Sequence, residues 1–300
     1  LVFSLLLTAG YLVWLFYEGY AARRARRSFR HVIHVNGIRG KTATCRLLDA
    51  HLRRGGYKVF TKTTGTAPAY IDTAGVEHPI RRRGAANIME QWHVLQKAYR
   101  EGTEILIVEC MAVSPVLQKV SQEKLVQGDW NVITNVRYDH IFEMGESLDE
   151  IAESLSSTIP QGGVLFTGDP DFFPFFEGKC TALGTEAILC PPEGGAGSEN
   201  QAIAWAIGAR LGISPGPLPG EAEGYRRDFG ACKCYDLPGK KFLNLFSAND
   251  PESSQMLLRE NLPGEEELTL IYNHRVDRLD RLLLFLRYFF PQVPYRKLIL

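Results

Sequence analysis

The chain has 300 residues, which is enough for one large domain or two ordinary ones. Hydrophobic residues make up 45% of it and charged residues 23%, and 34 basic residues balance 34 acidic ones. Because this balance creates no overall field, it does not favour binding to nucleic acid, and we expect no nucleic-acid partner.

An uncharged apolar segment, residues 1–17, opens the chain and is just long enough to span a bilayer. A signal peptide would carry its basic residues before the apolar run. Here the basic residues follow the apolar run, as Arg23, Arg24, Arg26 and Arg27. By the positive-inside rule, this order places the rest of the chain in the cytoplasm. We predict a single-pass membrane protein with a transmembrane anchor over 1–20 and a basic juxtamembrane segment over 21–29. The alternative is a buried N-terminal core helix.

A glycine-rich turn follows the first strand-like run. Gly37 and Gly40 would let the backbone approach phosphate closely, and the helix that follows would attract its negative charge. Lys41 would reach the β- and γ-phosphates, and the Thr42 hydroxyl would bind Mg²⁺. The turn is shorter than a usual P-loop, whose first glycine is replaced here by Val35. The alternative is a tight strand–helix turn with a solvated lysine.

Strand and helix patterns alternate from residue 30 onward. The pattern predicts an α/β fold, a P-loop-containing, mostly parallel sheet with helices on both faces. The predicted strands cover 31–35, 57–62, 105–108, 131–135 and 164–166, and the predicted helices cover 42–54, 85–100, 115–126 and 148–159.

A Gly- and Pro-rich loop over 191–198 precedes a predicted helix over 200–211. After a second loop, the pattern predicts strands over 232–236, 241–246 and 268–272, a helix over 276–289 and the start of a strand over 297–300. We expect an ATP-binding domain over 30–260 and the start of a smaller, incomplete C-terminal α/β domain over 261–300.

Two strand ends carry residues suited to phosphate chemistry. Glu109 ends the third predicted strand, where a P-loop sheet delivers a carboxylate to Mg²⁺. The fourth strand leads into Asp139 and His140. Ligands bind at the carboxyl ends of parallel strands, so Thr42, Glu109 and His140 should converge. Alternatively, Glu109 is exposed to water and His140 is an ordinary surface or core histidine.

Several segments together resemble a known superfamily. Residues 37–42, 63–66 and 135–140, together with Glu109, resemble the ATP-binding central domain of the Mur ligases and folylpolyglutamate synthetases. A narrower resemblance, over about residues 1 to 290, is to the membrane-associated ligase subunits of poly-γ-glutamate synthases, the capsule CapB/PgsB type. The segments that carry it are 35–42, 62–66, 108–113, 248–251 and 275–278.

This resemblance implies site residues. Lys41, Glu109 and His140 would be catalytic, with Thr42 and Glu109 on a first Mg²⁺ and His140 on a second. ATP would contact Asn36, Gly37, Ile38, Arg39, Gly40, Lys41 and Thr42, with Asn200 near the adenine and Asp250 near the ribose. Substrate contacts would come from Thr64, Thr66, Arg81, Arg82, Arg83, Arg275 and Arg278.

The chain departs from the superfamily in two ways. Where relatives often have a metal-bridging carbamylated lysine it has Leu155, and it has no lysine between His140 and Lys179. It also lacks a full-sized N-terminal substrate domain before the P-loop, which argues against a peptidoglycan precursor as the substrate.

The resemblance implies an ATP-dependent ligase that polymerises glutamate through γ-linkages and an acyl-phosphate intermediate, together with small membrane subunits that export the polymer. Arg81, Arg82 and Arg83 could contact the growing polyanion, or could simply be a solvated face, and Arg275 and Arg278 could hold a carboxylate. The alternatives are an ATPase that energises an exporter, a ligase that adds glutamate to a small carboxylate, and a structural nucleotide-binding module.

Overall fold

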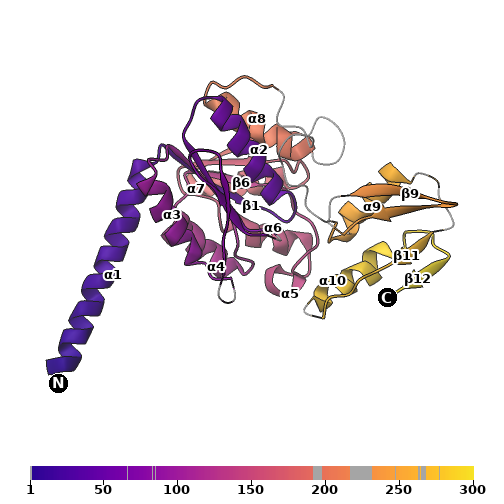
Figure 1. Cartoon of the computed structure of the whole chain (residues 1–300), viewed down its shortest axis with the longest axis horizontal. Helices are drawn as coiled ribbons and strands as arrows, with labels where there is room; N and C mark the ends of the chain where they lie inside the picture. The colour runs from indigo at the N-terminus through magenta and orange to yellow at the C-terminus, as the bar shows by residue number, and fades with distance from the viewer. Residues whose placement is uncertain are drawn as a thin grey trace.

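The computed structural model describes residues 2–65, 67–82, 84, 86–191, 198–216, 232–246, 248–262, 264, 268–276 and 278–300. Figure 1 shows three parts: a projecting N-terminal helix, an α/β body, and a smaller C-terminal unit beside the body.

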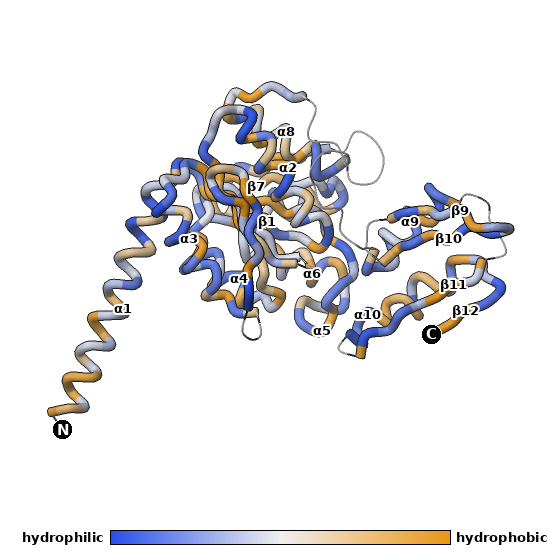
Figure 2. The backbone as a smooth tube through the Cα atoms, in the orientation of Figure 1, coloured by the Kyte–Doolittle hydropathy of each residue, from blue (hydrophilic) through white to orange (hydrophobic). Residues whose placement is uncertain are grey.

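The N-terminal helix α1 (Val2–Ser28) is continuous, and its apolar first half lies away from the body (Figures 1 and 2). It is long and apolar enough to cross a membrane. Its other end packs against α3 (Glu90–Arg100), where Ala22 and Ala25 are buried. Arg26 donates to the carbonyl of Gln127 at 2.6 Å and to Asp129 at 2.8 Å. The helix is therefore fixed to the body at its C-terminal end.

An eight-stranded sheet forms the body in the order β4-β3-β2-β5-β1-β6-β7-β8. The six neighbouring strands β2, β5, β1, β6, β7 and β8 are parallel. At one edge of the sheet, β3 pairs antiparallel with β2, and β4 pairs antiparallel with β3. The predicted mostly parallel α/β fold is therefore confirmed. The strands are β1 (His31–Asn36), β2 (Val59–Thr63), β3 (Ala69–Ile71), β4 (Glu77–Pro79), β5 (Ile105–Glu109), β6 (Trp130–Ile133), β7 (Val164–Thr167) and β8 (Glu186–Leu189).

Helices cover both faces of this sheet (Figure 1). On one face α2 (Lys41–Arg54) and α8 (Ser198–Arg210) pack together over the sheet's largest apolar cluster. Two further clusters lie under the other helices. Those helices are α3, α4 (Pro115–Val120) with the π-helical turn η1 (Ser121–Val126), α5 (Ile141–Met144), α6 (Leu148–Ser156) and α7 (Phe173–Leu183).

Some element bounds differ from the expectation. Helix α3 begins at Glu90 rather than at 85, because residues 87–89 form a turn in which the Asn87 side chain accepts from the Met89 amide. The short strands β3, β4 and β8 and the helices α5, α7 and α9 were not predicted.

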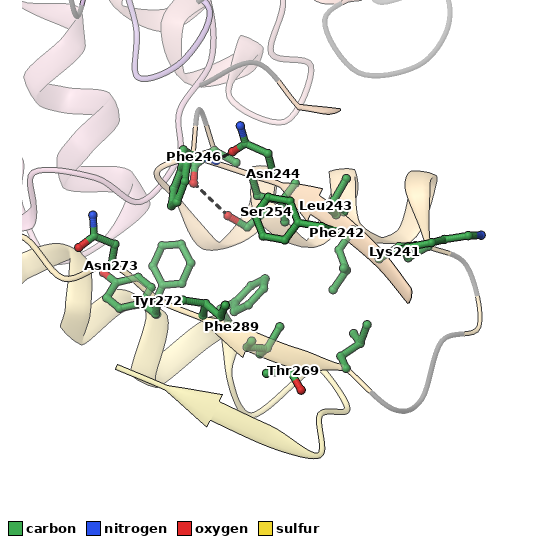
Figure 3. A pocket seen from close by; sticks show the side chains of 18 of the residues that line it. Lys241, Phe242, Leu243, Asn244, Phe246, Ser254, Thr269, Tyr272, Asn273 and Phe289 are labelled. Carbon is green, nitrogen blue, oxygen red and sulfur yellow. Dashed lines mark hydrogen bonds between the residues drawn. The ribbon is translucent and has the colours of Figure 1, made fainter. Parts of the chain in front are cut away.

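The C-terminal unit contains two two-stranded sheets, β9–β10 and β11–β12. The strands and helices of this unit line an open, largely apolar cavity of about 980 Å³ (Figure 3). The apolar cluster of the C-terminal unit contains residues from both sides of position 260, including Leu243, Leu258 and Phe285. The expected domain boundary at 260/261 stays a prediction. The elements are β9 (Lys233–Leu237), β10 (Lys240–Asn244), α9 (Pro251–Asn261), β11 (Thr269–Ile271), α10 (Leu279–Leu284), η2 (Phe285–Phe289) and β12 (Lys297–Ile299).

A run of buried polar side chains crosses the α4–α6 side of the sheet. The His34 ring bonds Gln122 at 2.8 Å, and the His34 carbonyl accepts from Asn131 at 3.1 Å. Thr158 donates to Asn131 at 3.5 Å and accepts from Asn36 at 3.2 Å. We call this chain of contacts the polar ladder. It gives most of these buried groups a partner, while His34 Nε2 has none within the described residues, and it ends at Asn36, next to the glycine turn.

The contact between α2 and α8 depends on a missing side chain at Gly208. A Cβ at this position would overlap the fully buried His51 ring, whereas a Cβ at Gly178 in α7 would meet nothing within 4 Å. We expect Gly208→Ala to lower the free energy of unfolding by about 1–3 kcal/mol through overpacking. Gly178→Ala should be neutral or raise it by up to about 1 kcal/mol through helix propensity. Denaturant unfolding of both variants tests this, and equal effects would contradict it.

The buried ring of His34 should make the fold sensitive to acid. Burial lowers the pKa of His34 from 6.5 to about 4. Below pH 6.5 the unfolded chain therefore binds a proton that the folded chain does not, and stability should fall as the pH drops from about 6.5 to about 4. The limiting slope is about 1.4 kcal/mol per pH unit. Unfolding of His34→Leu across this range should show a shallower slope, and an unchanged slope would refute the assignment.

Candidate active site

The turn between β1 and α2 has the geometry of a phosphate cradle. Gly37 has φ 119° and Gly40 has φ 80°, a left-handed region that favours glycine. A Cβ at Gly37 would overlap Thr134, and one at Gly40 would overlap the Asn200 side chain. Both positions therefore require glycine, and the turn leads directly into the N-terminus of α2, where backbone N–H groups attract anions.

Lys41 is the first residue of α2, directly after this turn. Its Nζ donates to the carbonyls of Gly37 at 2.6 Å and Ile38 at 3.2 Å. Burial lowers the pKa of Lys41, an effect that Glu109 opposes. A partly buried ammonium bonded to carbonyls is poised to bind the oxygens of a phosphate.

Glu109 and Thr42 meet at the adjoining strand end. The Thr42 hydroxyl lies 2.9 and 3.1 Å from the two carboxylate oxygens of Glu109, and the Thr64 amide donates to that carboxylate at 2.7 Å. Glu109 is 2% exposed. A hydroxyl and a carboxylate side by side at a phosphate turn are a suitable oxygen set for Mg²⁺.

The end of β6 holds the turn from the other side. The Asn135 side chain accepts from the Arg39 amide at 2.9 Å and donates to the Arg39 carbonyl at 3.2 Å. The Asn135 side-chain nitrogen also donates to the carboxylate of Glu199 in α8 at 3.2 Å. The chain then reaches His140, whose φ of 52° places a non-glycine residue in the left-handed region. Such a backbone is uncommon for residues other than glycine and occurs at helix ends, as at Gln127, as well as at functional sites.

His140 is held as a neutral imidazole. Burial lowers its pKa from 6.5 to about 4, against the attraction of Asp139. Its Nε2 lies 4.0 Å from Asp139 and its Nδ1 lies 3.9 Å from Glu143. A neutral ring has a free lone pair, which is the form that binds a metal.

Arg39 joins the turn to the C-terminal unit. Its Nη2 lies 2.9 Å from Asp139, and its Nε lies 2.7 Å from Asp250, the fully buried N-cap of α9. The rings of Tyr138 and Tyr288 stack at 4.8 Å across the same boundary. The phosphate turn, the His140 segment and the C-terminal unit are thus connected.

Asp139, His140 and Asp280 bring their ligand atoms within 4.8 Å of one another. Arg39 and Arg278 bind Asp139, and Arg278 also binds Asp280 at 3.0 and 3.1 Å. Since guanidinium groups already neutralise both carboxylates, Asp139 and Asp280 are ion-pair partners, and His140 is the member of this group whose ligand atom is not taken by an arginine. Asp280 carried no sequence signal, since it lies outside every motif.

The remaining predicted residues lie as follows. Asn200 accepts from Thr44 at 3.0 Å beside Gly40, close to the turn. The Asn36 side chain is committed to the polar ladder and bonds Gln118 at 2.7 Å, so it faces away from the turn. Arg82 pairs with Glu90 at 2.7 Å, while Arg81 and Arg275 are exposed. Thr66 and Arg83 lie outside the described residues.

The absence of the superfamily's metal-bridging lysine has a structural counterpart at position 155. Leu155 is fully buried in an apolar cluster with Ile151 and Phe176. Lys179 pairs with Glu153 at 2.6 Å on a partly exposed surface. A metal-bridging lysine at position 155 would therefore have to displace core packing.

Two family models match the chain. The Mur ligase middle domain matches residues 35–168, and the poly-gamma-glutamate synthase CapB C-terminal domain matches residues 235–300. The chain is 34% identical over 291 residues to PGA synthase CapB of Bacillus subtilis (strain 168), covering 89% of this chain and 73% of that protein. It is 33% identical over 282 residues to capsule biosynthesis protein CapB of Bacillus anthracis, covering 87% of this chain and 61% of that protein.

Solved structures share the fold at low identity. A bifunctional folylpolyglutamate synthase/dihydrofolate synthase with Mn, AMPPNP and L-glutamate bound has a TM-score of 0.59 at 15% identity, covering 91% of this chain and 77% of that one. MurF from Acinetobacter baumannii has a TM-score of 0.57 at 17% identity, covering 84% of this chain and 58% of that one.

The cradle geometry can be tested at Gly40. In Gly40→Ala the turn must move to relieve both the left-handed strain and the overlap with Asn200, so the Kd for ATP should rise at least about tenfold. Gly56→Ala is the matched control, since it has φ 87° but its Cβ would meet nothing within 4 Å. Titration with a fluorescent ATP analogue should show the control unchanged. Equal losses in the two variants would contradict the cradle.

Proposed function

This chain belongs to the CapB family of poly-γ-glutamate synthase proteins, and from that premise we propose that it polymerises glutamate through γ-amide bonds by using ATP. It is an amide ligase of the Mur ligase type. The observation that carries the proposal is the meeting of Lys41 with the Thr42–Glu109 pair at the carboxyl edge of the sheet, where the C-terminal unit adjoins them.

The proposed ATP site consists of the turn amides from Gly37 to Gly40 and the ammonium of Lys41. Thr42 and Glu109 would hold one Mg²⁺, and the neutral ring of His140 would be a ligand for a second. When bound, these ions would neutralise phosphate charge during transfer. Asn200 lies beside the turn, which supports its proposed contact with the nucleoside. Asp250 is fully buried and bonds Arg39 and the Ser253 amide, so its proposed contact with the ribose would require these bonds to open.

The proposed reaction has two steps. A substrate carboxylate oxygen attacks the γ-phosphorus of ATP, ADP leaves, and an acyl phosphate forms. The amine of the next glutamate then attacks the acyl carbon, the C–N bond forms, phosphate leaves, and the amine loses a proton. Lys41 offsets charge on the transferring phosphoryl group, and the junction between the two units aligns the two substrates.

The membrane setting is also a proposal. Helix α1 is apolar over its exposed half and basic near the body, which supports a single-pass anchor with the catalytic body in the cytoplasm. Small membrane subunits would export the polymer. Since a soluble metabolite requires no anchored enzyme, α1 favours a polymer over a small acceptor, and Arg81 and Arg82 remain candidates for contact with the polyanion.

Glutamate-dependent ADP release tests the proposal. Membranes containing the full-length protein and its partner subunits should release ADP only with glutamate, together with acidic polymer. Lys41→Ala should lower both by at least about 100-fold, because it removes a cation that stabilises the transferring phosphoryl group. Lys119→Ala, in an exposed pair with Glu123, is the matched control and should leave both unchanged.

ADP release that ignores glutamate, without polymer, would favour an ATPase that energises an exporter. Release that requires glutamate but forms only a short product would favour a small acceptor.

A further inference from the structure

Arg281, in α10, is a buried guanidinium group without a close anionic partner. Its Nη1 donates to Asn249 Oδ1 at 3.3 Å, and its Nη2 lies 4.0 Å from Asp139 Oδ2. Its Nε is buried and has no hydrogen-bond partner within the described part of the chain. The side chain is 14% exposed. A buried donor left unpaired is costly, so a ligand that pairs with it would be stabilising.

The neighbouring arginines differ from Arg281. Arg39 contacts Asp139 at 2.9 Å and Asp250 at 2.7 Å. Arg278 binds Asp280 through two nitrogens and also contacts Asp139. If either of these arginines left its carboxylates to bind a ligand, those buried carboxylates would be unpaired. Arg281 can bind a new anion without breaking a short ion pair.

The place of Arg281 fits the reaction. Its Nη2 and the Nε2 of His140 are each 4.0 Å from the same oxygen of Asp139, so both side chains lie at one point of the junction. Arg281 and Asn249 also line the large cavity, together with Tyr272 and Asn273. Figure 3 shows Asn273 at one end of this cavity and Lys241 at the other. Arg281 therefore shares the lining of this cavity with the polar side chains of Asn249, Tyr272 and Asn273.

We propose that Arg281 binds the α-carboxylate of the incoming glutamate, an inference that rests on the proposed function. The α-carboxylate and the attacking amine are attached to the same carbon, so a two-bond contact from guanidinium to carboxylate would position the amine. Burial lowers the pKa of Arg281, and Arg278 and Arg39 lower it further, against the attraction of Asp139. A bound carboxylate would relieve this unfavourable environment.

The test compares two acceptors. 4-Aminobutyrate is glutamate without its α-carboxylate. In the full-length protein in membranes with its partner subunits, Arg281→Gln should raise the KM for glutamate by about 10- to 100-fold, the loss expected for a charge-assisted contact. The preference for glutamate over 4-aminobutyrate should fall by the same factor, while the KM for ATP stays unchanged. Arg281→Lys should lie between the wild type and Arg281→Gln.

Arg287→Gln is the matched control, since Arg287 lies over the Tyr288 ring in η2 and should leave every constant unchanged. Equilibrium binding of radiolabelled glutamate with a non-hydrolysable ATP analogue gives a readout that needs no turnover. Weaker glutamate binding by Arg281→Gln supports the inference even if the wild type makes no polymer, which would reject only the proposed function. Glutamate binding within about twofold of wild type, or loss of ATP binding in Arg281→Gln, overturns the inference.

Discussion

The carboxylate of Asp139 is only 4% exposed, and guanidinium groups approach it from both the phosphate turn and the C-terminal unit. A buried charge is tolerated only when it is paired, so Arg39 and Arg278 must stay in place for Asp139 to remain ionised. Because Arg39 belongs to the turn and Arg278 to the C-terminal unit, the same carboxylate holds both beside His140. The closeness of the two units at the site thus follows from the desolvation of one side chain.

The sequence predicted the sheet edge well, because parallel strands bring their carboxyl ends together whatever the intervening helices do. Thr42 and Glu109 were placed correctly next to each other on this basis, 67 residues apart in sequence. The pairing of Arg278 with Asp139 was not predictable, since it depends on how the C-terminal unit sits on the body. The orientation of Asn36 was also missed, because backbone position alone does not tell which face a strand-end side chain occupies.

The polar ladder has a mechanical role in this arrangement. Hydrogen bonds are directional, so buried amides and hydroxyls lose a bond when they are displaced. The ladder runs from Gln122 through His34, Asn131 and Thr158 to Asn36. It therefore resists small shifts of β1 relative to β6. Because the glycine turn directly follows β1, the ladder also helps to hold the start of that turn in place.

Helix α1 is unbroken from its apolar end to the point where Ala22 and Ala25 pack against the body. With the apolar end in a bilayer, as proposed, a continuous helix rather than a flexible linker would connect the body to the membrane. Each helical residue adds about 1.5 Å of height and about 100° of rotation, so the helix would fix both the distance and the orientation of the body. The number of residues between the bilayer and Ala22 would then set the azimuth of the catalytic edge. Inserting or deleting one residue there would rotate the site by about 100° about the helix axis relative to its membrane neighbours, without altering any contact inside the body.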